Sequence, residues 1–151
     1  GLGTRFLPAT KSMPKEMLPI IDKPIIQYVV EEITNAGFDE IIFVTHSSKN
    51  SIEDHFDTSF ELETTLEKRV KRSLLKEIKS ITKLKGTIIS IRQSEAKGLG
   101  HAILQAKEIV GNESFAVVLP DRVMHKGENS LVNNLSAMRD KFTKFGKSVI
   151  L

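Results

Sequence analysis

Apolar and polar positions along the chain predict strands and helices that follow each other in turn. Three short apolar runs, 41–45 (IIFVT), 87–93 (TIISIRQ) and 115–120 (FAVVLP), are each typical of a buried strand. Between them, apolar residues recur every three or four positions, which favours amphipathic helices. The predicted helices cover residues 25–36, 48–56, 61–81, 101–110 and about 131–142.

Two of these helices have clear sequence signals. Pro24 is expected at the first position of the first helix, with Asp22 just before it, and Gly37 is expected to end it. The segment 61–81 has the spacing of one long helix with a single apolar face. The residues of that face are Leu62, Leu66, Val70, Leu74 and Ile78.

Strands that alternate with helices predict a parallel sheet with right-handed crossovers, which is the doubly wound, Rossmann-like α/β class. In such sheets ligands bind outside the carboxyl ends of the strands. The residues that follow 87–93 and 115–120 fall at this edge, and so does the glycine-rich start of the chain if a strand precedes it. We therefore expect one ligand-binding crevice.

The composition agrees with a single compact unit that covers residues 1–151. The 151 residues are 40% hydrophobic, enough for one core and one domain. No apolar run reaches membrane-spanning length and no signal peptide is visible, so we expect no membrane association. The absence of cysteine fits a cytoplasmic protein.

The net charge of +3 is small and comes mostly from the basic segment 68–85. Such a segment can bind nucleic acid or a membrane surface, but a solvated helix face is the more common explanation. With no Trp and one Tyr, the chain lacks aromatic residues that would stack on bases. We expect no nucleic-acid partner.

The first residues, GLGTR, favour a phosphate-binding loop. Gly1 and Gly3 would let the backbone approach a phosphate chain, and Arg5 presents a planar cation that suits two phosphate oxygens. Lys15 adds a second cation. Taken alone, a Gly-x-Gly is more often an ordinary turn than a phosphate loop, and neither a third glycine nor a Gly-Lys-Ser/Thr motif follows it.

Asp121 follows the run 115–120 and is a candidate metal ligand. A carboxylate at the end of a strand suits Mg²⁺, which takes oxygen ligands and usually also bridges substrate phosphates. On position alone, an aspartate that caps a turn or a helix is the alternative.

The string GxGTRxLPxTK, followed by PKEMLP, resembles the signature of the sugar-nucleotide pyrophosphorylases, which are nucleotidyltransferases. Three further segments resemble the bacterial branch that acts on UTP and glucose 1-phosphate: ATKSMPKEMLPIIDKPIIQYVVEE, THSSKNSIEDHFDTSFELE and EKRVKRSLLKEI. The resemblance covers essentially all 151 residues. It implies a glycosyltransferase-A-like fold that is truncated at both ends here, because family members begin with an apolar strand and continue for about as many residues again.

The resemblance also implies roles for single residues. Arg5 and Lys15 would contact phosphate as the catalytic residues, and Asp121 would hold Mg²⁺. Gln93, whose amide is both donor and acceptor, would read the uracil base. The implied nucleotide-binding residues are Gly1, Leu2, Gly3, Thr4, Gln93 and Gly98. Arg122 departs from the usual family pattern, and we expect its side chain to point away from the metal.

The implied reaction transfers a uridylyl group from UTP to glucose 1-phosphate and releases pyrophosphate. Sugar-binding residues and a second metal aspartate lie beyond this sequence in the family, so the isolated fragment is expected to turn over poorly or not at all. A relative with another base specificity and a non-catalytic regulatory paralogue are the alternatives. Since family members commonly assemble, we expect a homo-oligomer at full length.

Overall fold

The computed structural model describes residues 3–46, 49–84, 86–123 and 133–150. At its centre β3 (Glu40–Thr45) and β4 (Thr87–Arg92) pair in parallel, in a register that joins Glu40 to Thr87 and Thr45 to Arg92. Both strands were predicted. The observed β3 starts one residue earlier than the predicted strand, and the observed β4 ends one residue earlier. The predicted α/β class with a parallel sheet is confirmed.

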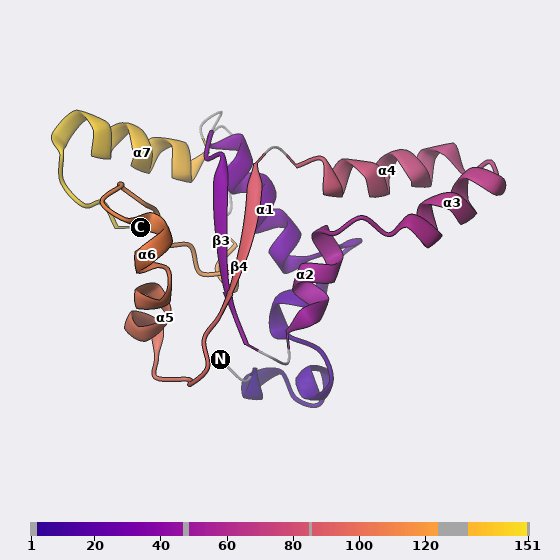
Figure 1. Cartoon of the computed structure of the whole chain (residues 1–151), viewed down its shortest axis with the longest axis horizontal. Coiled ribbons are helices and arrows are strands. Elements are labelled where there is room, and N and C mark those ends of the chain that lie inside the picture. Colours follow the sequence, from indigo (N-terminus) through magenta and orange to yellow (C-terminus); the bar gives the residue numbers. More distant parts are fainter. Residues whose placement is uncertain (1–2, 47–48, 85, 124–132, 151) are drawn as a thin grey trace.

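The helices lie on both sides of this pair (Figure 1). On one side are α1 (Ile25–Asn35) and α2 (Asn50–Phe56), and on the other are α5 (Leu99–Gln105) and α6 (Lys107–Val110). The last helix, α7 (Asn134–Phe145), contacts α1. The result is a layered arrangement in which the carboxyl ends of β3 and β4 point to the same end of the molecule.

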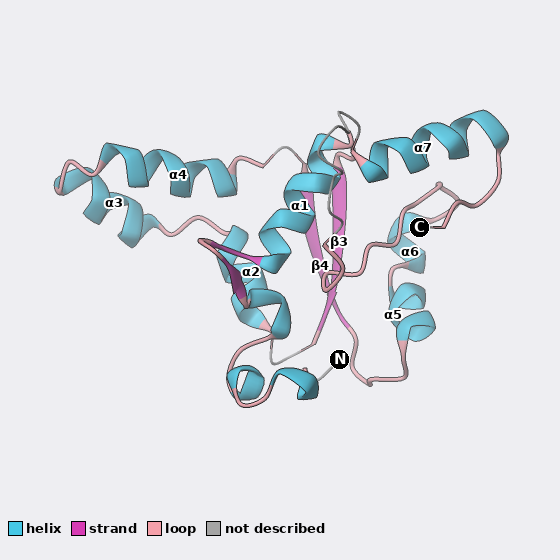
Figure 2. Cartoon of the chain, turned by 180° about the vertical axis from the view of Figure 1, so that it is seen from behind, coloured by secondary structure: helices cyan, strands magenta, loops and turns pink. Residues whose placement is uncertain are grey.

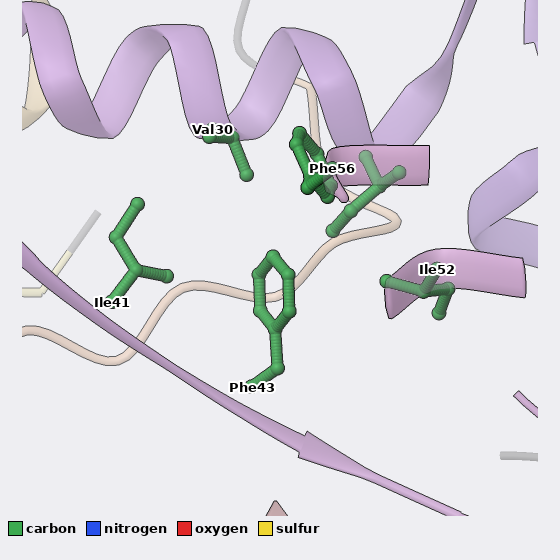
Figure 3. Close-up of a cluster of buried hydrophobic side chains, with 6 residues drawn as sticks. Val30, Ile41, Phe43, Ile52 and Phe56 are labelled. Carbon is green, nitrogen blue, oxygen red and sulfur yellow. The ribbon is translucent and has the colours of Figure 1, made fainter. Parts of the chain in front are cut away.

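The core lies between α1, α2 and β3 (Figure 3). Val30 of α1 is fully buried, Ile41 and Phe43 of β3 point towards it, and Ile52 and Phe56 of α2 close the cluster. The rings of Phe43 and Phe56 are 5.6 Å apart and tilted. Alternate residues of β3 are buried here because side chains on a strand point to opposite faces.

The chain before α1 starts at the carboxyl ends of the strands and ends in a small strand pair beside α2 (Figures 1 and 2). It consists of three single-turn helices, η1 (Thr4–Phe6), η2 (Ala9–Lys11) and η3 (Lys15–Met17), and a small antiparallel pair, β1 (Pro19–Ile20) with β2 (Lys23–Pro24). The prediction for Pro24 was wrong by one position. Pro24 is the extended N-cap residue, with ψ of 149°, because it still pairs with Pro19 in the β1–β2 pair.

The single long helix predicted over 61–81 is two helices, α3 (Phe60–Lys68) and α4 (Arg72–Thr82). The chain turns back between them at Val70, whose φ is 53°. The apolar spacing predicts a continuous face but carries no information about a turn made by a residue other than glycine or proline. Together α3 and α4 form an arm that projects from the body (Figures 1 and 2).

The strand predicted at 115–120 is absent, since these residues have an irregular conformation. A strand needs a neighbour for its backbone hydrogen bonds, and in the described part of the chain β3 has its ladder partner, β4, on one side only. The helix predicted from His101 begins at Leu99, and α6 follows it as a separate short helix.

The predicted starts of two helices fall outside the described residues, at Ser48 and Leu131. In the described part, α2 begins at Asn50 and α7 begins at Asn134. The side chain of Asn133 caps α7 by accepting hydrogen bonds from the backbone N–H groups of Leu135 and Ser136. None of the helices in the described ranges has the length and apolar content needed to cross a bilayer.

Candidate active site

A cavity of about 790 Å³ runs along the whole of β3 and reaches Gln93, just beyond the carboxyl end of β4. Its polar wall includes Lys15 and Glu16 of η3, Lys49 at the start of α2, Gln93 after β4, and Asp121. The remainder of its wall is largely apolar and comes from α1, β3, α5 and the segment 115–119. The carboxyl end of β4 is on the edge at which parallel α/β sheets bind ligands.

Lys15 and Asp121 form an ion pair inside this cavity. Lys15 Nζ donates to Asp121 Oδ2 at 2.6 Å. The ammonium group of Lys15 holds the pKa of the Asp121 carboxyl below its ordinary value, chiefly through this hydrogen bond. Asp121 is therefore a carboxylate at neutral pH, and the ammonium group of Lys15 balances its charge.

The next residue of η3 makes a second ion pair. Lys49 Nζ donates to Glu16 Oε1 at 2.6 Å, and Glu16 is only 3% exposed. Its other oxygen, Oε2, is buried and has no hydrogen-bond partner among the described residues. This pair ties η3 to the loop that follows β3, as Lys15 ties η3 to the end of the segment 115–120.

Gln93 is held between the end of β3 and the loop before α5. Its backbone N–H donates to the carbonyl of Thr45 at 2.9 Å. Its side-chain Nε2 lies 2.8 Å from His101 Nδ1 and 3.4 Å from the carbonyl oxygen of Gly98. Gly98 has a φ of 93°, a conformation that glycine adopts more easily than other residues. Gln93 and Gly98, predicted separately, thus lie together in the cavity wall.

The described residues of the predicted glycine loop, Gly3, Thr4 and Arg5, are not part of the cavity wall. Gly1 and Leu2 are beyond the described residues, and Thr4 and Arg5 are exposed. Gly3 has a φ of 66°, and a Cβ at this position would lie 3.2 Å from Cβ of Thr10, whose hydroxyl donates to the Gly3 carbonyl at 2.6 Å. Gly3 is therefore required by the turn and by the close approach of Thr10.

The Asp121 carboxylate fits a site for a hard cation such as Mg²⁺. Asp121 is ionised, and 36% of its side chain is exposed. In the described ranges there is no group of three or more His, Asp or Glu side chains arranged to hold a metal ion. Mg²⁺ commonly uses one or two carboxylates and completes its shell with water and substrate phosphates, so a single aspartate is a fitting donor set. Arg122 is exposed and does not line the cavity.

Sequence reasoning missed three residues of this site: Glu16, Lys49 and His101. His101 was assigned no chemistry, but its ring contacts Gln93. Glu16 and Lys49 have no motif of their own, since charged residues in loops are usually solvated. The one available signal was the position of Glu16 next to Lys15 in the motif PKEMLP. Its role in a buried ion pair is seen only in the structure.

The parallel strand pair has helices on both sides, and its cavity contains the ion pair of Lys15 and Asp121. These features define a doubly wound α/β protein with a ligand-binding crevice. The chain belongs to the nucleotidyl transferase family, whose model matches residues 1–149. It is 59% identical to the UTP–glucose-1-phosphate uridylyltransferases of Haemophilus influenzae and Escherichia coli. All of this chain is matched, against 52% and 50% of those two proteins.

Solved structures agree with these matches. The UDP-glucose pyrophosphorylase from Acinetobacter baumannii is 52% identical, with a TM-score of 0.90. A UTP-bound structure of the enzyme from the same organism gives a TM-score of 0.91 at 52% identity. In both, 97% of this chain matches 50% of the other. The chain thus spans about half the length of the relatives it matches.

Proposed function

We propose that this chain is the nucleotide-binding part of an enzyme that transfers a uridylyl group from UTP to glucose 1-phosphate. The observation that carries the proposal is the meeting around one cavity of three segments far apart in sequence, which supply Lys15, Gln93 with Gly98, and Asp121. The names of relatives that are 59% identical, and the UTP-bound neighbour, support the choice of substrates.

In the proposed reaction a phosphate oxygen of glucose 1-phosphate attacks the α-phosphorus of UTP. The new oxygen–phosphorus bond forms as the bond from the α-phosphorus to the bridging oxygen breaks, and pyrophosphate leaves with that electron pair. Because the nucleophile is already an anion, the step needs no strong general base. The work of the protein is to position the two phosphates and to neutralise their charge.

Lys15 is the cation best placed for this work, since its ammonium group lies in the cavity at the carboxyl edge. Arg5 is proposed as a second phosphate ligand, and it is exposed at the same end of the molecule. Gly1, Leu2, Gly3 and Thr4 are proposed to bind the nucleotide phosphates through their backbone.

We propose Mg²⁺ as the metal, with Asp121 as its ligand in this part of the chain. When bound, Mg²⁺ would neutralise and orient the phosphate oxygens. The Asp121 carboxylate accepts from Lys15, and it would hold Mg²⁺ through its oxygens. An ionised carboxylate that is 36% exposed is accessible to such a cation.

Gln93 is proposed to read the uracil base, and the backbone of Gly98 is proposed to lie against the nucleotide. The Gln93 side chain combines a donor and an acceptor, and its contacts with Gly98 and His101 restrict its orientation. A relative that prefers another base is the nearest alternative. Competition by dTTP tests it, and discrimination that depends on one methyl group is expected to be modest, about 10–200-fold.

The remaining features are proposals of the same kind. We propose a cytoplasmic enzyme with neither nucleic-acid nor membrane partners, which forms a homo-oligomer. The absence of cysteine supports the cytoplasmic location. The lack of aromatic residues in the basic segment 68–85 argues against a nucleic-acid partner. Residues 1–151 alone are expected to bind nucleotide weakly, and robust synthesis of UDP-glucose by them would contradict this.

The test is Mg²⁺-dependent release of pyrophosphate from UTP and glucose 1-phosphate. It uses the complete gene product that contains residues 1–151, referred to below as the complete protein. Asp121→Ala should abolish release, while Asp140→Ala, on the exposed face of α7, should not change it. Binding of UTP without release by the unmodified protein would favour a regulatory paralogue, and preference for dTTP would replace the proposed substrate.

A further inference from the structure

The nitrogen end of the Gln93 amide is held at the start of α5. Its Nε2 lies 2.8 Å from His101 Nδ1 and donates to the carbonyl oxygen of Gly98 at 3.4 Å. The backbone of the same residue is fixed to the end of β3 by its hydrogen bond to Thr45. Among the described residues, Oε1 of Gln93 has no hydrogen-bond partner. The two ends of this amide therefore differ in what they can still do for a ligand.

The carbonyl of Gly98 determines which end of the amide lies at α5. A carbonyl oxygen only accepts hydrogen bonds, so the amide atom that faces it has to be the nitrogen. The same carbonyl accepts from the backbone N–H of Ala102 at 3.1 Å, in the first turn of α5, and the helix thus fixes its direction. An amide turned over would place Oε1 of Gln93 against this oxygen, where the two acceptors repel each other.

His101 supplies the second acceptor. A neutral imidazole has one N–H and one nitrogen with a free lone pair. Gln105 Nε2 lies 3.3 Å from the Nε2 of His101 and also donates to the His101 carbonyl at 3.4 Å. The contact of Gln93 with Nδ1 is shorter by half an ångström, so the lone pair belongs to Nδ1 and the ring proton to Nε2. Both N–H groups of the Gln93 amide are then in use.

An amide whose N–H groups are both used offers a ligand only its oxygen, which is an acceptor. Uracil carries an N–H at ring position N3 and can donate to that oxygen. Cytosine has a lone pair at N3, so the two acceptors would repel each other and both would stay unsatisfied. Thymine has the same N3–H as uracil, so this arrangement separates uracil and thymine from cytosine but does not separate uracil from thymine.

We propose that His101 is a positioning residue for base selection. By accepting from Gln93 Nε2 it fixes the amide with Oε1 towards the nucleotide, so that a base with an N–H at N3 is bound and cytosine is rejected. The inference rests on one part of the proposed function, the contact of Gln93 with the base, and not on the transfer reaction.

Displacement calorimetry with UTP and CTP, on the complete protein without glucose 1-phosphate, tests the inference. The measured quantity is the dissociation constant for CTP divided by that for UTP. Partial unfolding of a variant weakens both nucleotides by the same factor, so the ratio reports on recognition of the base alone. In His101→Leu the ratio should fall at least about fivefold, because the released amide can turn and offer its N–H groups to cytosine.

Two further variants separate the positioning of Gln93 from other effects. His101→Asn has a side-chain oxygen that can accept from Gln93 in place of Nδ1, and it should keep the ratio of the unmodified protein. Gln105→Met, the matched control, removes the amide on the other side of the ring and should also leave the ratio unchanged.

An unchanged ratio in His101→Leu would overturn the inference, and so would an equal fall in His101→Asn or in Gln105→Met. Failure of the proposed reaction has a different signature. A protein that prefers UTP to CTP in the way described but releases no pyrophosphate would refute uridylyl transfer and would leave the role of His101 supported.

Discussion

Lys15 Nζ lies 2.6 Å from Asp121 Oδ2, although the two residues are 106 positions apart in the chain. The contact joins the glycine-rich opening segment to the end of the run 115–120, at the edge where the parallel strands end. It places the candidate phosphate ligand and the candidate metal ligand side by side. Since the pair belongs to the proposed reaction, its two residues are expected to affect catalysis much more than stability.

The first prediction concerns Lys15 itself. Lys15→Met should lower kcat/KM of the complete protein by about 10²-fold or more, because a fixed cation that meets developing phosphate charge is removed. The free energy of unfolding should change by no more than about 1 kcal/mol, the usual range for a partly exposed ion pair. Pyrophosphate release and urea unfolding measure the two effects. Lys11→Met, on the neighbouring turn η2, is the matched control, and equal activity losses in both variants would contradict the assigned role.

The second prediction concerns the buried pair of Glu16 and Lys49. Glu16→Ala leaves the ammonium group of Lys49 without its partner in a nearly buried position, which should cost about 3–5 kcal/mol of stability. Urea unfolding measures the loss. The double variant Glu16→Ala/Lys49→Met removes both charges and should recover part of it. A double variant that is as unstable as the sum of the single variants would show that the two side chains do not interact.

A third prediction follows from the contact between Gln93 and His101. His101→Ala should weaken UTP binding about fivefold, corresponding to the loss of one hydrogen bond of about 1 kcal/mol that orients the Gln93 amide. Calorimetric titration with UTP measures this. Gln105→Ala removes the other side-chain neighbour of His101 and is expected to have a smaller effect. Unchanged affinity in His101→Ala would show that Gln93 needs no such support.

The fourth prediction concerns pH. Burial lowers the pKa of His55 below its ordinary value of 6.5, and its Nε2 lies 3.0 Å from Gln27 Oε1. The unfolded chain therefore takes up a proton at a higher pH than the folded chain, so stability should fall as the pH drops below about 6.5. Urea unfolding at pH 7.5 and 5.5 measures the difference. His55→Gln should make this difference smaller, and an identical difference in both proteins would remove His55 as its source.

The strands β3 and β4 and the first helix follow directly from the sequence, because their signals are local, whereas β1 and β2 were not predicted. Residues 41–45 alternate between the core and the opposite face as a strand requires, and Gly37 ends the first helix with a φ of 81°. The failures have non-local causes. Residues 115–120 have the composition of a strand, but a ladder depends on a neighbour, and the fold at Val70 contradicts the preference of valine itself.

The candidate site was predictable to a similar extent. Lys15, Gln93, Gly98 and Asp121 could be named because each is a chemically distinctive residue at the end of a predicted strand or within a motif. Their contacts could not be predicted, since the ion pair of Lys15 with Asp121 depends on how the opening segment packs across the sheet. Glu16 and Lys49 were missed because only burial distinguishes a structural ion pair from two solvated side chains.

The crossover from β3 to β4 has a consequence for how this family can diversify. It leaves the cavity edge at Lys49, runs through α2, extends into the arm and returns at the far end of the sheet. Insertions and deletions in the arm therefore lengthen or shorten a segment whose two ends are fixed by α2 and β4. A change in the length of the arm is therefore expected to leave the residues around the cavity in place.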